Sequence, residues 1–239
     1  MKTIICESYE KACSAVADIY ALQLKQKPDS VLGLATGSTP IGLYDELVKR
    51  AKSGSIDFSK AKAFNLDEYY PIKASHAQSY KTFMDMHLFN KVKFQSTRIP
   101  NGEAPDWRTE CLEFDAELDA AGGLDLQLLG IGTNGHVGFN EPSVTYPLGS
   151  HLVELTEDTL KSNSRFFSEG EEQPKTALTM GIGQIFAAGH IVLLITGANK
   201  AEITKKLFDG KLHTDVPACF LMLHPNVTLI LDKDAAKWI

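Results

Sequence analysis

This sequence of 239 residues has no closely spaced pair of cysteines, no long apolar run and no excess of positive charge. Its four cysteines, at positions 6, 13, 111 and 219, show no C-x-x-C spacing, so neither a metal cluster nor a disulfide framework has a signature. No stretch approaches the length of a membrane span. The 24 basic residues against 30 acidic ones leave a formal charge of -6 and no basic stripe, which disfavours nucleic acid and membrane surfaces as partners. Small-molecule chemistry is therefore the favoured class of function.

Leader, linker and repeat signals are also missing. A strand-like run, Thr3–Cys6, follows Met1 and Lys2 without the features of a signal peptide, so we expect a cytoplasmic protein. A hydrophobic content of 44% is ample for a core, and we expect one domain over residues 1–239. Within it, the polar interval 143–175 is expected to form either a mobile lid or a solvated loop with a short helix.

Short runs of Val, Ile and Leu alternate with helical patterns along the chain. This alternation is typical of parallel strands joined by crossover helices, and it predicts an α/β fold with a mainly parallel central sheet and helices on both faces. Strands are predicted at Lys2–Cys6, Val31–Ala35, Lys62–Asn65, Asp125–Ile131, Ile191–Thr196 and Val227–Leu231, and helices at Tyr9–Gln26, Pro40–Lys52, Gln78–Phe89, Asp106–Ala121 and Ala198–Phe208.

The segment Gly130–Pro142 places a histidine and a carboxylate in a glycine-rich turn after a predicted strand. Its first three glycines satisfy G-x-G-x-x-G, but Gly138 and Pro142 prevent the helix that a dinucleotide site requires, so we reject that interpretation. His136 and Glu141 form an imidazole and carboxylate pair suited to proton transfer near neutral pH. A lone histidine is usually structural, but the surrounding glycines favour a functional one here.

A second turn, Thr36–Pro40, lies between a predicted strand and a predicted helix. Thr39 is expected to cap that helix and Pro40 to occupy its first position, which leaves backbone N–H groups and hydroxyls for an anion. No Gly-Lys-Ser/Thr follows, so a sugar phosphate fits better than a nucleotide triphosphate. The alternative is an ordinary capped helix. Arg165 and Lys200 could complete an anion site, although exposed cations are more often solvated surface residues.

The third predicted strand runs into Asp67 and Glu68, followed by Tyr69 and Tyr70. Ligands bind at the carboxyl ends of parallel strands, and a carboxylate that is partly desolvated there is suited to abstract a proton from carbon beside a carbonyl. The alternative is that Asp67 caps a helix and Glu68 forms a salt bridge. The residues alone do not rank one acid over the other as the base.

Two other chemistries lack their motifs. No G-x-S-x-G elbow is present, so a serine hydrolase is not supported. No H-E-x-x-H or similar spacing marks a metal site, and none is expected.

The segments Ala35–Pro40, Asn65–Tyr69, Gly130–Pro142 and Asn163–Phe167, with Lys200 after them, closely resemble those of glucosamine-6-phosphate deaminases over nearly the whole chain. The resemblance implies a modified Rossmann-like fold and a cofactor-free conversion of glucosamine 6-phosphate to fructose 6-phosphate and ammonia, in amino-sugar catabolism. It also implies the roles of individual residues. Asp67 would move the proton between C2 and C1, His136 with Glu141 would open the sugar ring with Asn134 beside them, and the phosphate would be held by Gly37, Ser38, Thr39, Arg165 and Lys200.

This chain departs from the family pattern in two places that bear on its chemistry and its regulation. Many members have aspartate at the position of Asn134, and a neutral amide can orient an imidazole but cannot stabilise an imidazolium as a carboxylate does. Hexameric, allosterically activated members use basic residues where this chain has Ser150–Leu155, and they have a longer C-terminal tail. We therefore expect a monomer or small homo-oligomer with hyperbolic kinetics, insensitive to N-acetylglucosamine 6-phosphate.

Two rival functions remain open at this point. A 6-phosphogluconolactonase would use the same phosphate turn, and a histidine to activate water, but would release no ammonia. A sugar-phosphate sensor would keep the pocket without turnover, which the joint presence of Asp67, His136 and Glu141 disfavours.

Overall fold

Seven parallel strands form the central sheet of this protein in a computed structural model that describes residues 1–164, 167 and 172–239. The strand order is β1-β10-β9-β6-β2-β3-β5, and each strand runs parallel to its neighbours. The predicted α/β class and the mainly parallel sheet are confirmed. The strands are β1 (Lys2–Cys6), β2 (Val31–Leu34), β3 (Lys62–Asn65), β5 (Ser96–Arg98), β6 (Leu126–Leu129), β9 (Ile191–Ile195) and β10 (Val227–Asp232).

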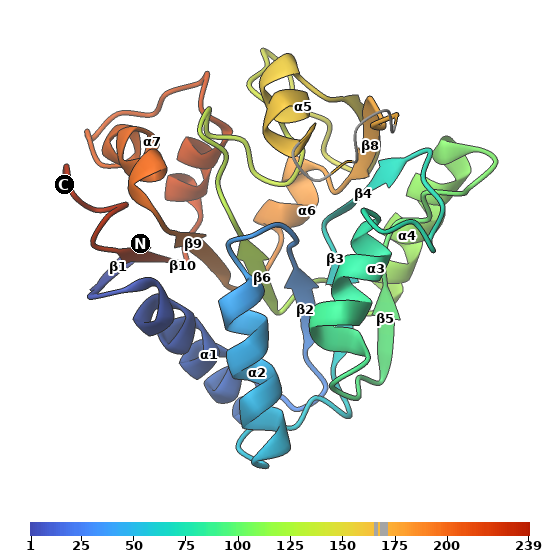
Figure 1. Cartoon of the computed structure of the whole chain (residues 1–239), viewed down its shortest axis with the longest axis horizontal. Helices are drawn as coiled ribbons and strands as arrows, with labels where there is room; N and C mark the ends of the chain where they lie inside the picture. Colours follow the sequence, from blue (N-terminus) through green and yellow to red (C-terminus); the bar gives the residue numbers. More distant parts are fainter. Residues whose placement is uncertain (165–166, 168–171) are drawn as a thin grey trace.

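Helices follow most strands and enclose the core. Figure 1 shows α1, α2 and α3 on the face of the sheet toward the viewer. Every residue of β2, β6, β9 and β10 is buried, as expected for strands covered on both faces. The helical segments are α1 (Tyr9–Gln26), α2 (Ile41–Lys52), α3 (Tyr80–Met84), η1 (Asp85–Phe89), α4 (Trp107–Ala120), α5 (Glu157–Ser164), α6 (Ile182–Phe186), η2 (Ala198–Lys200), α7 (Ala201–Leu207) and η3 (Pro217–Leu223).

A second, three-stranded antiparallel sheet was not predicted from the sequence. Its order is β4 (Asp67–Tyr70), β8 (Thr176–Thr179) and β7 (His151–Glu154). It lies beyond the carboxyl ends of β2 and β3, with α5 beside it (Figure 1). The interval 143–175, expected to be a lid or a solvated loop, therefore contains a paired strand and a helix in its described part. Lid closure stays a prediction.

The predicted helices that differ from the observed ones include those at Pro40–Lys52 and Gln78–Phe89. The helix expected at Pro40–Lys52 begins at Ile41, and Pro40 stands at the N-cap without a side-chain hydrogen bond. Thr39 therefore does not cap α2, and Pro40 is not its first helical residue, since the cap is supplied from another helix, as described below. The helix expected at Gln78–Phe89 is α3 followed by the π-helical turn η1.

Within the described ranges, no helix combines the length and the apolar character needed to cross a membrane. The same residues contain no group of three or more His, Cys, Asp or Glu side chains placed to hold a metal ion.

Candidate functional site

A cavity of about 550 Å³ lies at the carboxyl ends of the central strands. Chain order reverses between β2 and β6, because the connection after β2 leads to β3 on one side and the connection after β6 leads toward β9 on the other. Ligands in open parallel sheets bind at such a reversal. The cavity is lined by the turns after β2, β3, β6 and β9, and its volume suits a hexose phosphate.

The turn after β2 contributes Gly37, Ser38 and Thr39 to the lining. Gly37 has a φ of 97°, a left-handed conformation that favours glycine, so the turn can bend back over the strand end. The turn leads directly into α2, whose N-terminus offers backbone N–H groups and the positive end of the helix dipole. This is a suitable place for a phosphate group.

Lys200 also lines the cavity, from the turn after β9. It ends η2 and is the N-cap of α7, which agrees with its predicted place at the start of a helix. Arg165, the other predicted cation, lies outside the described residues.

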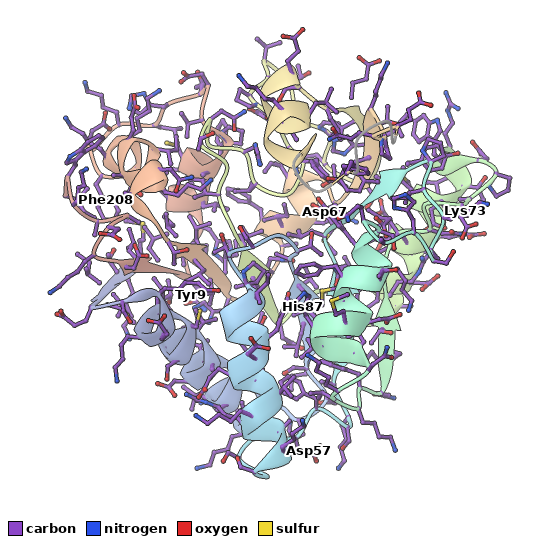
Figure 2. The ribbon with its side chains drawn as sticks, viewed as in Figure 1. Tyr9, Asp57, Asp67, Lys73, His87 and Phe208 are labelled. Carbon is purple, nitrogen blue, oxygen red and sulfur yellow. The ribbon has the colours of Figure 1, made fainter. Side chains whose placement is uncertain are left out.

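Asp67 and Glu68 are separated by the alternation of strand β4. Asp67 lines the cavity, whereas Glu68 does not. The Glu68 carboxylate accepts hydrogen bonds of 2.9, 2.8 and 2.9 Å from the backbone N–H groups of Tyr69, Tyr80 and Lys81. Asp67, which the sequence offered as a helix cap, caps no helix among the described residues: the N-cap of α3 is Ser79, and Glu68 accepts from the next two N–H groups of that helix. Asp67 (Figure 2) is left facing the space that a substrate would occupy.

Burial sets the protonation behaviour of both acids. Asp67 is 6% exposed, and burial, assisted by the charge of Glu68, raises its pKa to about 8. Burial also raises the pKa of Glu68, to about 7, although its three backbone donors act in the opposite direction. Asp67 can therefore exchange a proton near neutral pH, which is the behaviour required of a general base.

His136 and Glu141 meet, as the sequence predicted. Nδ1 of His136 lies 3.3 Å from Oε2 of Glu141, and the imidazole lines the cavity. The other Glu141 oxygen accepts a hydrogen bond from the hydroxyl of Thr159 on α5. Asn134 donates to Oε2 of Glu141 at 2.7 Å and accepts from the backbone N–H of His136 at 3.2 Å. Asn134 thus orients the carboxylate and the turn, and not the imidazole itself.

Glu141 is held as a carboxylate. Its burial alone would raise its pKa, but His136, Thr159 and Asn134 together outweigh that effect, and the net shift is downward. The residue is 8% exposed and its carboxylate is ionised beside the imidazole, an arrangement that holds the ring in place and supports proton transfer.

One glycine of this turn, Gly132, makes room for the imidazole. A Cβ atom added to Gly132 would lie 2.3 Å from Nδ1 of His136. The backbone N–H of Gly132 donates to the carbonyl of His136 at 2.9 Å, which closes the turn on itself. The isolated bridge between Val137 and Asn140 follows this turn, and no helix is formed there.

The lining residues that were not singled out from the sequence include Tyr9, Tyr80, Thr159 and Lys161. They come from the starts of α1 and α3 and from α5, far along the chain from the turns that they meet. No local pattern marks them, because an ordinary amphipathic helix has the same residue types at its start.

Comparison with known proteins agrees with this geometry. The sequence model of the family described as glucosamine-6-phosphate isomerases/6-phosphogluconolactonase matches residues 7–230. Glucosamine-6-phosphate deaminase of Thermoanaerobacter pseudethanolicus is 50% identical over all of this chain and 95% of its own length. The protein of the same name from Clostridium botulinum, strain Loch Maree, is 47% identical over 99% of this chain and 98% of its own.

Solved structures give the same result. The structure of a monomeric glucosamine-6-phosphate deaminase is 41% identical, has a TM-score of 0.95 and covers 100% of both chains. A 6-phosphogluconolactonase from Trypanosoma brucei, at 17% identity and a TM-score of 0.77 over 99% of this chain and 97% of its own, shares the fold alone. The chain therefore belongs to the glucosamine-6-phosphate isomerase/6-phosphogluconolactonase family.

Proposed function

We propose that this protein converts glucosamine 6-phosphate and water to fructose 6-phosphate and ammonia. The proposal rests on one cavity that brings three groups together. They are a helix N-terminus suited to phosphate, the buried carboxylate of Asp67, and the imidazole of His136, which contacts Glu141. The 50% and 47% identical relatives named glucosamine-6-phosphate deaminase support the same assignment. We also assign the protein to the cytoplasm, where the phosphorylated sugar would be met.

Binding would begin with the phosphate. Gly37, Ser38 and Thr39 would hold it at the start of α2, with Lys200 as a cation and Arg165 as a second by resemblance. Binding energy from this remote group would fix the reacting carbons over Asp67.

Ring opening would be the task of His136. Its Nδ1 faces Glu141, so Nε2 is the atom left to take the proton of the C1 hydroxyl, and a proton returned to the ring oxygen gives the open-chain aldehyde. Glu141 would stabilise the imidazolium that forms between the two transfers.

Isomerisation would be the task of Asp67. The aldehyde acidifies the proton on C2, and the Asp67 carboxylate would remove it, which leaves an enolamine across C1 and C2. Return of the proton to C1 gives an iminium at C2. Addition of water there and departure of the nitrogen as ammonia yield fructose 6-phosphate. The substrate's own carbonyl and amine supply the electron flow for every step.

The deciding experiment measures ammonia and fructose 6-phosphate released from glucosamine 6-phosphate by purified protein without added cofactor. Wild type should release both in equal amounts, whereas Asp67→Asn should bind the substrate without turnover. If wild type releases neither, 6-phosphogluconolactone is the next substrate. Turnover of that lactone would identify the hydrolase of the same fold, and its absence would favour a sugar-phosphate sensor.

We further propose that the enzyme acts as a monomer without allosteric activation. The monomeric deaminase of known structure is 41% identical over the whole chain. In Ser150–Leu155, where activated family members have basic residues, this chain has no lysine or arginine, and burial lowers the pKa of His151, which keeps that ring neutral. An effector phosphate would therefore meet no cation from this segment.

A further inference from the structure

The hydroxyl of Tyr9 joins the start of α1 to the start of α2. It donates a hydrogen bond of 2.9 Å to the carbonyl of Thr39 and accepts one of 2.8 Å from the backbone N–H of Gly42. Thr39 and Gly42 lie on the two sides of Pro40, where α2 begins. Figure 2 shows Tyr9 at the start of α1, next to the first turn of α2. The phenol also lines the cavity.

This contact replaces a missing cap. The first N–H groups of a helix have no partner within it, and a side chain at the N-cap usually accepts one of them. Pro40 occupies that position in α2 and cannot do so. Tyr9, more than thirty residues away in the sequence, supplies the acceptor instead. The cap of α2 is thus a tertiary contact.

Gly42 is matched to the phenol. A Cβ atom there would lie 2.8 Å from both Cε1 and the hydroxyl oxygen of Tyr9, closer than such atoms approach in proteins. Alanine would otherwise be favoured over glycine within a helix, by about 1 kcal/mol. Glycine at position 42 therefore leaves the room that the Tyr9 ring needs to reach the backbone of α2.

The hydroxyl keeps its proton across the working range. Burial, the largest effect, raises the pKa of Tyr9 to about 12, so the group remains able to donate to Thr39 while it accepts from Gly42. The Tyr9 hydroxyl therefore acts as donor and acceptor at the same time, which fixes its position between Thr39 and Gly42.

We propose that Tyr9 is a positioning residue for phosphate: by holding Thr39 and Gly42 it fixes the turn Gly37–Thr39 in the shape that receives the phosphate group. The inference rests on the proposed function for the identity of the substrate, but not for the presence of an anion site. Tyr9 would act on binding and not on the proton transfers, because its two bonds go to the phosphate turn and to α2.

The test is Tyr9→Phe, which keeps the ring and removes both hydrogen bonds. We expect KM for glucosamine 6-phosphate to rise roughly five- to thirtyfold, because each of the two lost bonds contributes about 1 kcal/mol and tenfold corresponds to about 1.4 kcal/mol. The value of kcat should stay within twofold. The dissociation constant of inorganic phosphate, measured by calorimetry, should rise by the same factor, and this measurement needs no turnover. KM for ammonia in the reverse reaction should not change.

Two further variants make the test specific. Gly42→Ala keeps the tyrosine at position 9 but displaces its ring and hydroxyl from α2, so it should weaken phosphate binding in the same way. Tyr20→Phe is the control, because Tyr20 lies on the same helix and its buried hydroxyl has no hydrogen-bond partner among the described residues. It should leave KM and phosphate affinity as they are.

An unchanged phosphate affinity in Tyr9→Phe would overturn the proposal. So would an equal loss of affinity for phosphate and for ammonia, since that result would mean a general loosening of the fold. If wild type releases no ammonia but Tyr9→Phe still weakens phosphate binding, the deaminase function fails and the role of Tyr9 stands.

Discussion

Asn134 donates a 2.7 Å hydrogen bond to the same Glu141 oxygen that lies 3.3 Å from the imidazole of His136. An amide can do this while it accepts from the backbone N–H of His136, as it does at 3.2 Å. A carboxylate at position 134 could accept but could not donate. The residue type therefore decides how much negative charge surrounds the imidazole.

Asn134→Asp tests that relationship. The second carboxylate would favour the protonated imidazole, whereas ring opening requires the neutral one. We therefore expect the acid limb of the kcat profile to move to higher pH by about 0.5 to 1 unit. Loss of the donor to Glu141 should lower the free energy of unfolding by about 1 to 2 kcal/mol. Asn134→Ala, which removes the donor without adding charge, should lose stability without the upward shift. An unmoved acid limb with intact substrate binding would contradict the charge argument.

Gly132→Ala should damage catalysis through the position of His136. The added Cβ would lie 2.3 Å from the ring, which would have to move away from Glu141. A displacement of about 1 Å at a reacting group costs roughly 100-fold in rate, so we expect kcat to fall by roughly 10- to 100-fold. Gly130→Ala is the matched variant, because its Cβ would meet nothing within 4 Å and its backbone is not in the left-handed region. Equal losses in the two variants would rule out the steric explanation.

How far the sequence predicts this protein depends on how local each signal is. The bounds of β1 and α1 follow from the apolar pattern of a single segment and agree with the structure. Strand β4 was missed because it follows β3 after one residue, Leu66, and only pairing with the distant β8 makes it a strand.

The residues of the site also divide into those marked by local sequence and those brought in by distant contacts. The segments that follow β3, β6 and β9 carry Asp67, His136 and Lys200 in local patterns that can be recognised. The contact of Thr159 with Glu141 and that of Tyr9 with Thr39 join separate parts of the chain, and only folding brings them together.

Glu68→Gln should move the acid limb of the pH profile. Burial is the main cause of the raised pKa of Asp67 and the charge of Glu68 is the second. Tyr44 and Tyr80 also face Asp67, but burial raises the pKa of each well above its ordinary value, so both remain neutral. Without the Glu68 charge the pKa of Asp67 falls, and the acid limb of kcat/KM should shift to lower pH by about 0.5 to 1 unit.

Glu110→Gln is the control for that shift. Glu110 is also buried, at 5% exposure, and accepts from the backbone N–H of Asn101, but it lies on α4 outside the cavity lining. Both variants should lower the melting temperature, because each replaces a hydrogen-bonded buried carboxylate. Only Glu68→Gln should move the acid limb. Equal pH profiles for Glu68→Gln and wild type would show that burial alone sets the pKa of Asp67.

Rate curves test the regulatory proposal. With no lysine or arginine in Ser150–Leu155, initial rates should follow a hyperbola in glucosamine 6-phosphate. Addition of N-acetylglucosamine 6-phosphate should not activate the enzyme, and sedimentation should give a mass near 26.2 kDa. Sigmoidal curves that this ligand converts to hyperbolas would refute the proposal.

Asp67→Asn should raise stability while it abolishes turnover, and the gain should depend on pH. The pKa of Asp67 is about 8 in the folded protein against an ordinary value of 3.8, so between these values the folded state holds a proton that the unfolded state has released. Wild-type stability therefore falls as pH rises through this window, whereas the amide that replaces the carboxyl group in the variant carries no charge at any pH. Between pH values of about 5.5 and 8.5, the difference in free energy of unfolding in favour of the variant should grow by about 1 to 3 kcal/mol. Each kcal/mol should appear as a difference of roughly 2 to 4 °C in melting temperature. All other ionisable groups are shared by the two proteins, so their contributions cancel in the difference. A difference in melting temperature that is constant over this pH range would mean that Asp67 is not buried with a raised pKa, and the argument for its action as a base near neutral pH would lose its electrostatic support.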